Sequence, residues 1–235
     1  MKSTKIIKII KTLFILVIVF SIMWELYVEI RQSIDCSRAT DKVNVLQYIE
    51  FVGDVGDKTK ENIERILKNE VPDEALNYLI NGSGKIVIVY NENRDVTDYL
   101  NENYGFNLPK TDVYISGTNI PYHDLIGNLV KIDVVIATNN LFNEEIGHEL
   151  AHTYDLIKGN LSDKSDFMEI YNNRENVSKK VLSQAVIYRD YYESKPTEYF
   201  AELCKRYMRG DFRKGYNDEM DMVIDYFDKL GIKKE

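Results

Sequence analysis

The chain has 235 residues, which is enough for one domain with a sizeable core and a short appendage. Its 30 basic and 38 acidic residues give a formal charge of -8, and no cluster of Lys and Arg after the N-terminus could neutralise phosphates, so nucleic acid is not an expected partner. Collagen-like, Pro-rich and repeat architectures are also excluded, because the chain has only 4 prolines and shows no internal period.

The N-terminal segment differs in composition from the rest of the chain. An almost unbroken apolar run covers residues 12–24 and follows the lysines Lys2, Lys5, Lys8 and Lys11. Because positive charge stays on the cytoplasmic side, the chain after about Ile30 is expected outside the membrane. The run is short for a membrane span and typical of a signal-peptide core, although flanking lysines can snorkel and further apolar residues extend it.

The sequence leaves open whether this N-terminal segment is cleaved. Trp24 is followed directly by Glu25, Leu26 and Tyr27 rather than by a small-x-small cleavage site, which favours an uncleaved anchor. We therefore expect residues 1–35 to form a cytoplasmic N-terminus and signal anchor, and residues 40–235 to form an extracytoplasmic domain. The alternative is a signal peptide whose removal releases a secreted protein.

Helical and strand patterns then follow without regular alternation. Apolar spacing predicts amphipathic helices at residues 63–67, 76–80 and 96–100. Short β-branched runs predict strands at residues 85–90, 113–116 and 132–137, and the last two are separated by a predicted loop that contains Gly117, Pro121 and Gly127. From Leu141 the pattern is helical, ending in a packing helix before Gly231. These elements predict an α+β domain with a small mixed sheet and a mostly helical C-terminal half.

The clearest motif is His-Glu-Leu-Ala-His, from His148 to His152, within a predicted helix over residues 142–157. Residues four apart share one face of a helix, so both imidazoles can reach one metal ion. Glu149 is rotated to one side, which leaves its carboxylate beside the metal rather than on it. This arrangement predicts a zinc site in which Glu149 is a general base.

Two other interpretations of the motif deserve comparison. A chance match is improbable, because the whole chain has only 3 histidines and two of them stand in this register. A purely structural zinc site would favour cysteine ligands, but Cys36 and Cys204 both lie away from the motif.

A catalytic zinc ion needs a third protein ligand, and no third histidine follows nearby. Residues 191–202 offer several carboxylates, and Ser194 with Pro196 marks a helix start just before Glu198. Glu198 and Glu202 then share one helical face. One carboxylate can complete a His-His-Glu set while the other supports a ligand by a hydrogen bond.

These motifs together resemble a known family. The segment HELAHTYD from His148 to Asp155, with Tyr191 seven residues before Glu198 in EYFAE, is similar to the catalytic domain of anthrax toxin lethal factor and to the secreted Pro-Pro endopeptidases that share that domain. The likeness covers about residues 75–207, including NYLINGSG at residues 77–84. The paired motifs are far more specific than the first motif alone. The resemblance implies a zincin-like metallopeptidase fold.

The resemblance also implies roles for single residues. It implies one zinc ion held by His148, His152 and Glu198, with Glu149 as base and Tyr191 as donor to the oxyanion. Tyr192 is the alternative donor to the oxyanion. A shift of one residue in the match to the family would place Tyr192, and not Tyr191, at the donor position. Glu202 and Asp155 are expected to support the ligands, with a surface salt bridge as the alternative for Asp155.

The expected protein is thus an extracytoplasmic zinc endopeptidase, single-pass in the membrane, monomeric, and acting on a protein or peptide substrate. The length leaves no room for the additional domains of lethal factor, so the resemblance covers the protease unit only. The rival from another class is a non-catalytic surface module that keeps the fold and the metal. Loss of Glu149 or Glu198 would mark such a module, and both residues are present.

Three further features carry weaker expectations. Cys36 and Cys204 permit at most one disulfide in an exported chain, but both are expected to stay unpaired. His123 is expected in a solvated loop, with a place in the cleft as the alternative. The strand Ile132–Ile136 could pair with an extended substrate if it lies at a sheet edge, although an interior strand would have the same pattern.

Overall fold

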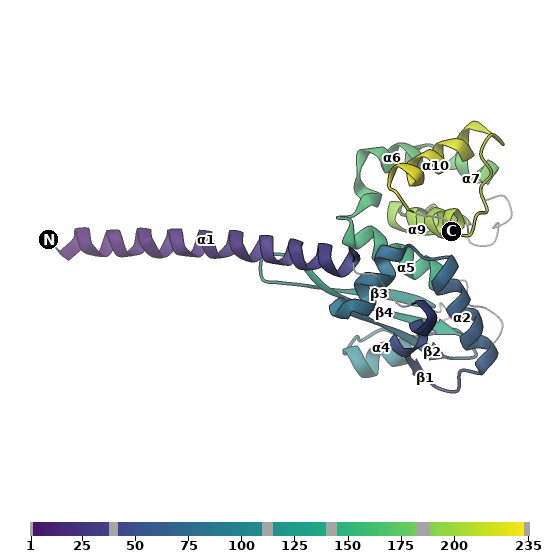
Figure 1. Cartoon of the computed structure of the whole chain (residues 1–235), viewed down its shortest axis with the longest axis horizontal. Coiled ribbons are helices and arrows are strands. Elements are labelled where there is room, and N and C mark those ends of the chain that lie inside the picture. Colours follow the sequence, from purple (N-terminus) through teal and green to yellow (C-terminus); the bar gives the residue numbers. More distant parts are fainter. Residues whose placement is uncertain (1, 38–41, 110–114, 140–144, 182–188, 233–235) are drawn as a thin grey trace.

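The structure is a computed structural model that describes residues 2–37, 42–109, 115–139, 145–181 and 189–232. A long N-terminal helix, α1 (Lys2–Ser37), projects from a compact body (Figure 1). In that body, helix α5 (Glu145–Ile157) lies between a small sheet on one side and a group of C-terminal helices on the other (Figure 1). The site motif therefore lies at the junction of the two halves.

Helix α1 contains the apolar run. In the part of the chain that the structure describes, it is the one helix that is long and apolar enough to cross a membrane, over the 19 residues Ile10–Val28. Almost all of this stretch is exposed, and its last residue, Val28, is buried at 9% exposure. A signal sequence passes the same test of length and composition, so the choice between anchor and signal peptide stays a prediction.

The sheet has four strands in the order β1-β2-β4-β3, and the strands are β1 (Ile49–Val52), β2 (Gly84–Tyr90), β3 (Gly117–His123) and β4 (Leu129–Thr138). The pairs β1-β2 and β2-β4 are parallel and β3-β4 is antiparallel. The predicted α+β class with a small mixed sheet is confirmed. The predicted strands at residues 85–90 and 132–137 are also confirmed, because β-branched residues suit a central strand that is buried on both faces.

Strand β3 was not predicted. Gly117 and Pro121 indicated a loop, but both lie in β3, where Pro121 is tolerated because an edge strand leaves one side of its backbone unpaired. His123 ends this strand rather than lying in a loop. Of the predicted strand at 113–116, residues 113 and 114 lie outside the described residues, and residues 115 and 116 are not in a strand. The short strand β1 was missed.

The position of the sheet edge corrects another prediction. Strand β4, which contains Ile132–Ile136, lies between β2 and β3 and is paired on both sides. It cannot receive an extended substrate as an added strand. The outer strand on this side of the sheet is β3.

Alternating side chains of the central strands build two cores. Ile86 and Ile88 of β2, with Val134 of β4, join the large core that contains α2, α3 and α5. Val87 and Val135 face the other side, where they pack with α4 in a smaller cluster. These helices are α2 (Asp57–Asn69), α3 (Asp73–Tyr78) and α4 (Thr97–Tyr104).

The C-terminal half is helical, as predicted, and comprises α6 (Ser165–Asn172), α7 (Arg174–Val181), α8 (Arg189–Tyr192), α9 (Pro196–Met208) and α10 (Asp218–Lys229). Pro196 is the first residue of α9, where its missing N–H costs no hydrogen bond. Aromatic rings join these helices, because Phe200 of α9 lies 5.1 Å from Phe167 and 5.6 Å from Phe227 between ring centroids. This packing joins α9 to α6 and α10.

Candidate metal centre

Helix α5 presents two different faces. Ile146, Leu150 and Ala151 are fully buried in the large core, which fixes the rotation of the helix. Gly147 faces α9 closely, because a Cβ there would lie 3.0 Å from Cγ of Lys205. The remaining face of α5 therefore carries the two histidines toward the N-terminal end of α9.

The three predicted ligands meet at one point. Nε2 of His148 lies 3.2 Å from Nε2 of His152 and 3.1 Å from Oε2 of Glu198, and the His152 nitrogen lies 3.5 Å from the same Glu198 oxygen. Glu198 comes from the first turn of α9, fifty residues later in the chain. The structure thus brings together the residues that the motif and its resemblance selected.

These separations fit a tetrahedral metal ion. Zinc bonds of ~2.0–2.1 Å at tetrahedral angles place neighbouring ligand atoms about 3.3 Å apart. The observed distances of 3.1, 3.2 and 3.5 Å lie on both sides of that value. Two imidazole nitrogens and one carboxylate oxygen are also an ordinary zinc donor set, so His148, His152 and Glu198 fit a zinc ion in both chemistry and spacing.

The ionisable side chains at this point shift one another's pKa. Burial alone would lower the pKa of His148, but the neighbouring carboxylates of Glu198 and Glu202 outweigh burial and raise the pKa to about 9. Burial opposes ionisation of Glu198, yet its contacts with His148 and His152 hold the pKa of that carboxyl well below its usual range. The carboxylate is therefore ionised and available as a ligand throughout the neutral range.

Glu202 lies behind His148, one turn after Glu198. Its Oε2 is 3.8 Å from Nδ1 of His148, which is buried and has no hydrogen bond among the described residues. Glu202 itself is 1% exposed and forms ion pairs of 2.6 Å with Lys205 and Arg206. A carboxylate in this position can orient the His148 ring, because it accepts the Nδ1 proton once Nε2 faces a metal.

Glu149 is held by strand β3. Its Oε2 accepts a hydrogen bond of 2.9 Å from Nδ2 of Asn119, which also donates to the Glu149 carbonyl oxygen at 2.8 Å. Thr153 donates from Oγ1 to Oδ1 of Asn119 at 2.6 Å, which fixes the orientation of the amide. A Cβ at Gly117 would lie 2.6 Å from Cγ and Oε1 of Glu149, so only glycine leaves room there.

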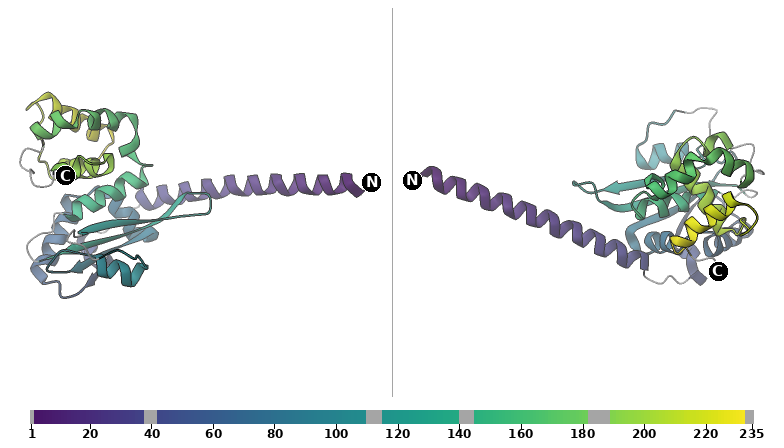
Figure 2. Two further views of the ribbon diagram at one scale, coloured as in Figure 1. Left: turned by 180° about the vertical axis from the view of Figure 1, so that it is seen from behind. Right: turned by 90° about the horizontal axis from the view of Figure 1, so that it is seen from above.

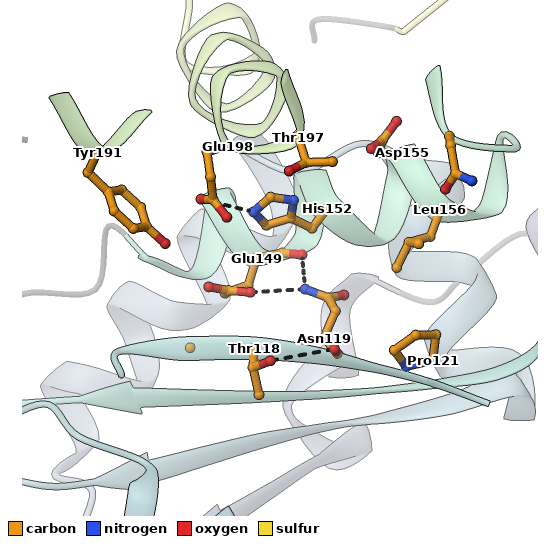
Figure 3. Close-up of a pocket in the computed structure, with 12 residues that line it drawn as sticks. Thr118, Asn119, Pro121, Glu149, His152, Asp155, Leu156, Tyr191, Thr197 and Glu198 are labelled. Atoms are coloured by element: carbon orange, nitrogen blue, oxygen red, sulfur yellow. Dashed lines mark hydrogen bonds and ion pairs between the residues drawn. The ribbon is translucent and has the colours of Figure 1, made fainter. Parts of the chain in front are cut away.

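An open cleft of about 380 Å³ lies over this arrangement, and Glu149, His152, Tyr191 and Glu198 are among its lining residues (Figure 3). The Tyr191 hydroxyl points toward the carboxylates of Glu149 and Glu198 (Figure 3). Partial burial of this group, with the negative charge of Glu198, raises the pKa of Tyr191, so its phenol keeps its proton.

Tyr192 is placed differently. It does not line the cleft. Its ring centroid lies 5.6 Å from that of His148, and Nζ of Lys205 lies 5.8 Å from the centre of the ring. Of the two tyrosines, Tyr191 therefore has the geometry of a donor into the cleft.

The other singled-out residues lie apart from the three ligand atoms. Asp155 is buried at 3% exposure, not in a surface salt bridge, and accepts hydrogen bonds from the backbone N and Oγ of Ser162 at 2.7 and 2.6 Å. Its predicted support of a histidine stays a prediction.

His123 is exposed and does not line the cleft. Cys204 is a buried free thiol, and the side chain of Cys36 lies outside the described part.

Sequence reasoning missed Gly117, Asn119 and Thr153. Thr153 stands four residues after Glu149, and this spacing alone places it on the same side of α5. Asn119 and Gly117 carry no such signal, because they reach Glu149 only through the pairing of β3 with β4.

Comparisons with known proteins add little to this geometry. No family model and no curated protein matches the chain. Among solved structures, the chain is similar to the Pro-Pro endopeptidase from Paenibacillus alvei, with 18% sequence identity, coverage of 79% of this chain and 98% of that chain, and a TM-score of 0.49. That protein belongs to one of the groups that the motifs resemble, but a likeness this weak carries no argument.

Proposed function

We propose that this chain is an extracytoplasmic zinc-dependent endopeptidase. The observation that carries the proposal is the convergence of Nε2 of His148, Nε2 of His152 and Oε2 of Glu198 at separations of 3.1 to 3.5 Å, beside the Glu149 carboxylate and under an open cleft. One zinc ion fits these three ligand atoms. When bound, it would supply Lewis-acid chemistry to a water molecule and to a peptide carbonyl.

The side chains around that point have matching roles. Burial raises the pKa of Glu149, although His148 and His152 oppose this, and a raised pKa suits a base that takes a proton from water and returns it to the leaving amine. Tyr191 keeps its phenolic proton and directs it toward the position of the developing oxyanion. Glu202 orients His148 from behind.

Strand β3 supports a peptide as the substrate. Gly117, Thr118 and Asn119 line the cleft, and no described strand pairs with the outer side of β3. Its free backbone groups offer hydrogen bonds to an extended chain, which would lie across the metal ligands. We infer from this a protein or peptide substrate.

We place the catalytic domain outside the membrane, joined to it by α1. The apolar stretch Ile10–Val28 fits a span, and the lysines before it predict that the N-terminus is cytoplasmic. Residues 40–235 would then form the peptidase domain. A secreted form, after cleavage of the segment, is the alternative.

The decisive variant is Glu149→Gln, which keeps the size of the side chain and removes the base. We expect hydrolysis of a peptide library by the zinc-loaded protein to fall by ~10²–10⁴-fold while bound zinc stays at one equivalent. Glu169→Gln, on the exposed surface of α6, is the matched control and should keep full activity.

The same assay separates the rival function. A non-catalytic metal-binding module would bind zinc through His148 and His152 yet hydrolyse no member of the library. Such an outcome for the unmodified protein would overturn the proposal.

A further inference from the structure

The turn between β3 and β4 is tightly built. The backbone N of Asp124 donates to the carbonyl oxygen of Asn128 at 2.9 Å, and Gly127 N donates to Asp124 O at 3.1 Å. Oδ1 of Asp124 also accepts from the backbone N of Ile126 and of Asn128, at 3.0 and 2.9 Å. The backbone N–H groups of four turn residues thus have partners inside the turn, which lowers the cost of bringing its backbone, but not the charged Asp124 carboxylate, into a less polar environment.

The side chains at this turn are unusually apolar for a surface. Among the described residues outside α1, eight large apolar or aromatic side chains are exposed, namely Tyr48, Phe106, Tyr122, Leu125, Ile126, Val130, Tyr191 and Tyr216. Four of the eight lie on the β3–β4 hairpin. Leu125 at its tip is fully exposed, at 106%, and Ile126 is 48% exposed. A cluster of this kind on one projecting turn indicates an interaction surface.

The tip lies beside the apolar part of α1. Nε1 of Trp24 donates a hydrogen bond of 2.6 Å to Oδ2 of Asp124. The hairpin extends from the sheet along α1 in the direction of the N-terminus in the views from both sides (Figures 1 and 2). The exposed Leu125 and Ile126 therefore continue the apolar surface of the helix.

The contact with Trp24 fixes the position of the hairpin tip along the apolar stretch of α1. Trp24 stands four residues before Val28, the end of the apolar stretch, which corresponds to about 6 Å along a helix. Trp24 and Tyr27, whose ring centroids are 5.7 Å apart, are the residue types that gather at the headgroup level. In a membrane that α1 crosses, the boundary of headgroups and acyl chains would thus lie near Leu125 and Ile126.

We propose that the tip of the β3–β4 hairpin inserts Leu125 and Ile126 into the leaflet on the outer side of the membrane that α1 crosses. The proposal rests on the membrane anchor of the proposed function, but not on peptidase activity. It gives the domain a second membrane contact besides α1. Because β3 also carries Asn119 and Gly117, this contact would fix the orientation of the cleft relative to the lipid surface.

The test uses the full chain in lipid nanodiscs that hold one copy each. Leu125→Cys is made in a Cys36→Ser background and labelled with an environment-sensitive fluorophore, since Cys204 is fully buried. Lipids with a spin label near the headgroup or deeper in the acyl chain report depth through quenching. Tyr216→Cys, 69% exposed on a loop before α10, carries the same label as the control.

We expect strong quenching by the lipid label near the headgroup at position 125, and none at position 216. Equal access of both labels to a soluble quencher in water would overturn the proposal. The measurement is repeated in larger nanodiscs that hold several copies, and protection at position 125 that occurs only there would also overturn the proposal, because the occupant would then be a second copy of the chain. If the label at position 125 prevents folding, Ile126→Cys replaces it.

The outcome is independent of the proposed chemistry. Quenching is measured on the Glu149→Gln variant as well as on the unmodified chain, and the two should agree. An inactive enzyme with a quenched tip would contradict only the proposed function, while an active enzyme with a tip in water would contradict only this inference.

Discussion

Asn119 Nδ2 donates two hydrogen bonds to Glu149, one of 2.9 Å to the side-chain carboxylate and one of 2.8 Å to the backbone carbonyl oxygen. One amide on strand β3 thus holds both the side chain and the helix backbone of the proposed base. The amide is itself fixed by Thr153. Glu149 is therefore positioned before any substrate arrives.

Replacement of Asn119 by Ala should lower kcat by about 10–100-fold and leave KM and zinc content close to those of the unmodified enzyme. The acid limb of the pH profile should also move to higher pH, because a donor to the carboxylate favours its ionised form and its loss raises the pKa of Glu149. Steady-state kinetics over a pH series measures both effects. Asn176→Ala, at an exposed position of α7, is the control. An unshifted pH profile with full kcat would contradict a positioning role.

Gly117→Ala should impair catalysis through a steric effect. The new Cβ would lie 2.6 Å from Glu149, so the carboxylate or strand β3 must move. We expect kcat to fall at least ~10-fold, since displacement of a base by a fraction of an ångström is costly. Thr118→Ala, on the next residue of β3, should have a much smaller effect. Zinc binding should be the same in both variants, because neither residue contacts a ligand.

Tyr191→Phe should lower kcat by ~10²-fold or more with zinc retained, because it removes a donor to the oxyanion. Tyr192→Phe should have a much smaller effect, since the ring of Tyr192 packs on His148 and lies outside the cleft. Kinetics of the two variants on one peptide distinguishes them. If Tyr192→Phe caused the larger loss, the roles of the two residues would have to be exchanged.

Removal of the metal should affect both activity and stability. A chelator should abolish hydrolysis, and added zinc should restore it. Because zinc binds the three ligands only in the folded chain, the metal-free protein should unfold at a lower temperature. Glu198→Ala should lose most of its zinc affinity and with it this difference in Tm. Unchanged zinc affinity in that variant would exclude Glu198 as a ligand.

The ion pairs of Glu202 predict a stability that depends on pH. Burial opposes its ionisation, but His148, Lys205 and Arg206 outweigh burial and lower its pKa to about 2. A carboxyl with a depressed pKa stabilises the fold above its unfolded pKa of ~4.3, and this contribution is lost as pH falls toward 2. In the metal-free protein, the gap in unfolding free energy between wild type and Glu202→Gln should be on the order of 3 kcal/mol at pH 7 and shrink below pH 4. Urea unfolding followed by circular dichroism measures it, and a gap that does not change with pH would refute the ionic origin.

The sequence alone determined the features that depend on local backbone geometry. A spacing of four residues placed His148 and His152 on one helical face, and Pro196 marked the start of the helix that carries Glu198. The β-branched runs of β2 and β4 likewise identified the central strands, because such residues suit a buried pleated surface. These patterns needed no knowledge of the partners.

The tertiary structure decided the contacts between residues far apart in the chain. Asn119 contacts Glu149, thirty residues later in the chain, only because β3 pairs with β4 at the sheet edge. Gly117 and Pro121 had indicated a loop at this position, so the strand was not predicted. In α8, Tyr191 lines the cleft while the ring of Tyr192 packs against His148. The contact of Asp124 with Trp24 spans a hundred residues. Such relationships depend on how buried surfaces fit together, and no local period in the sequence encodes that fit.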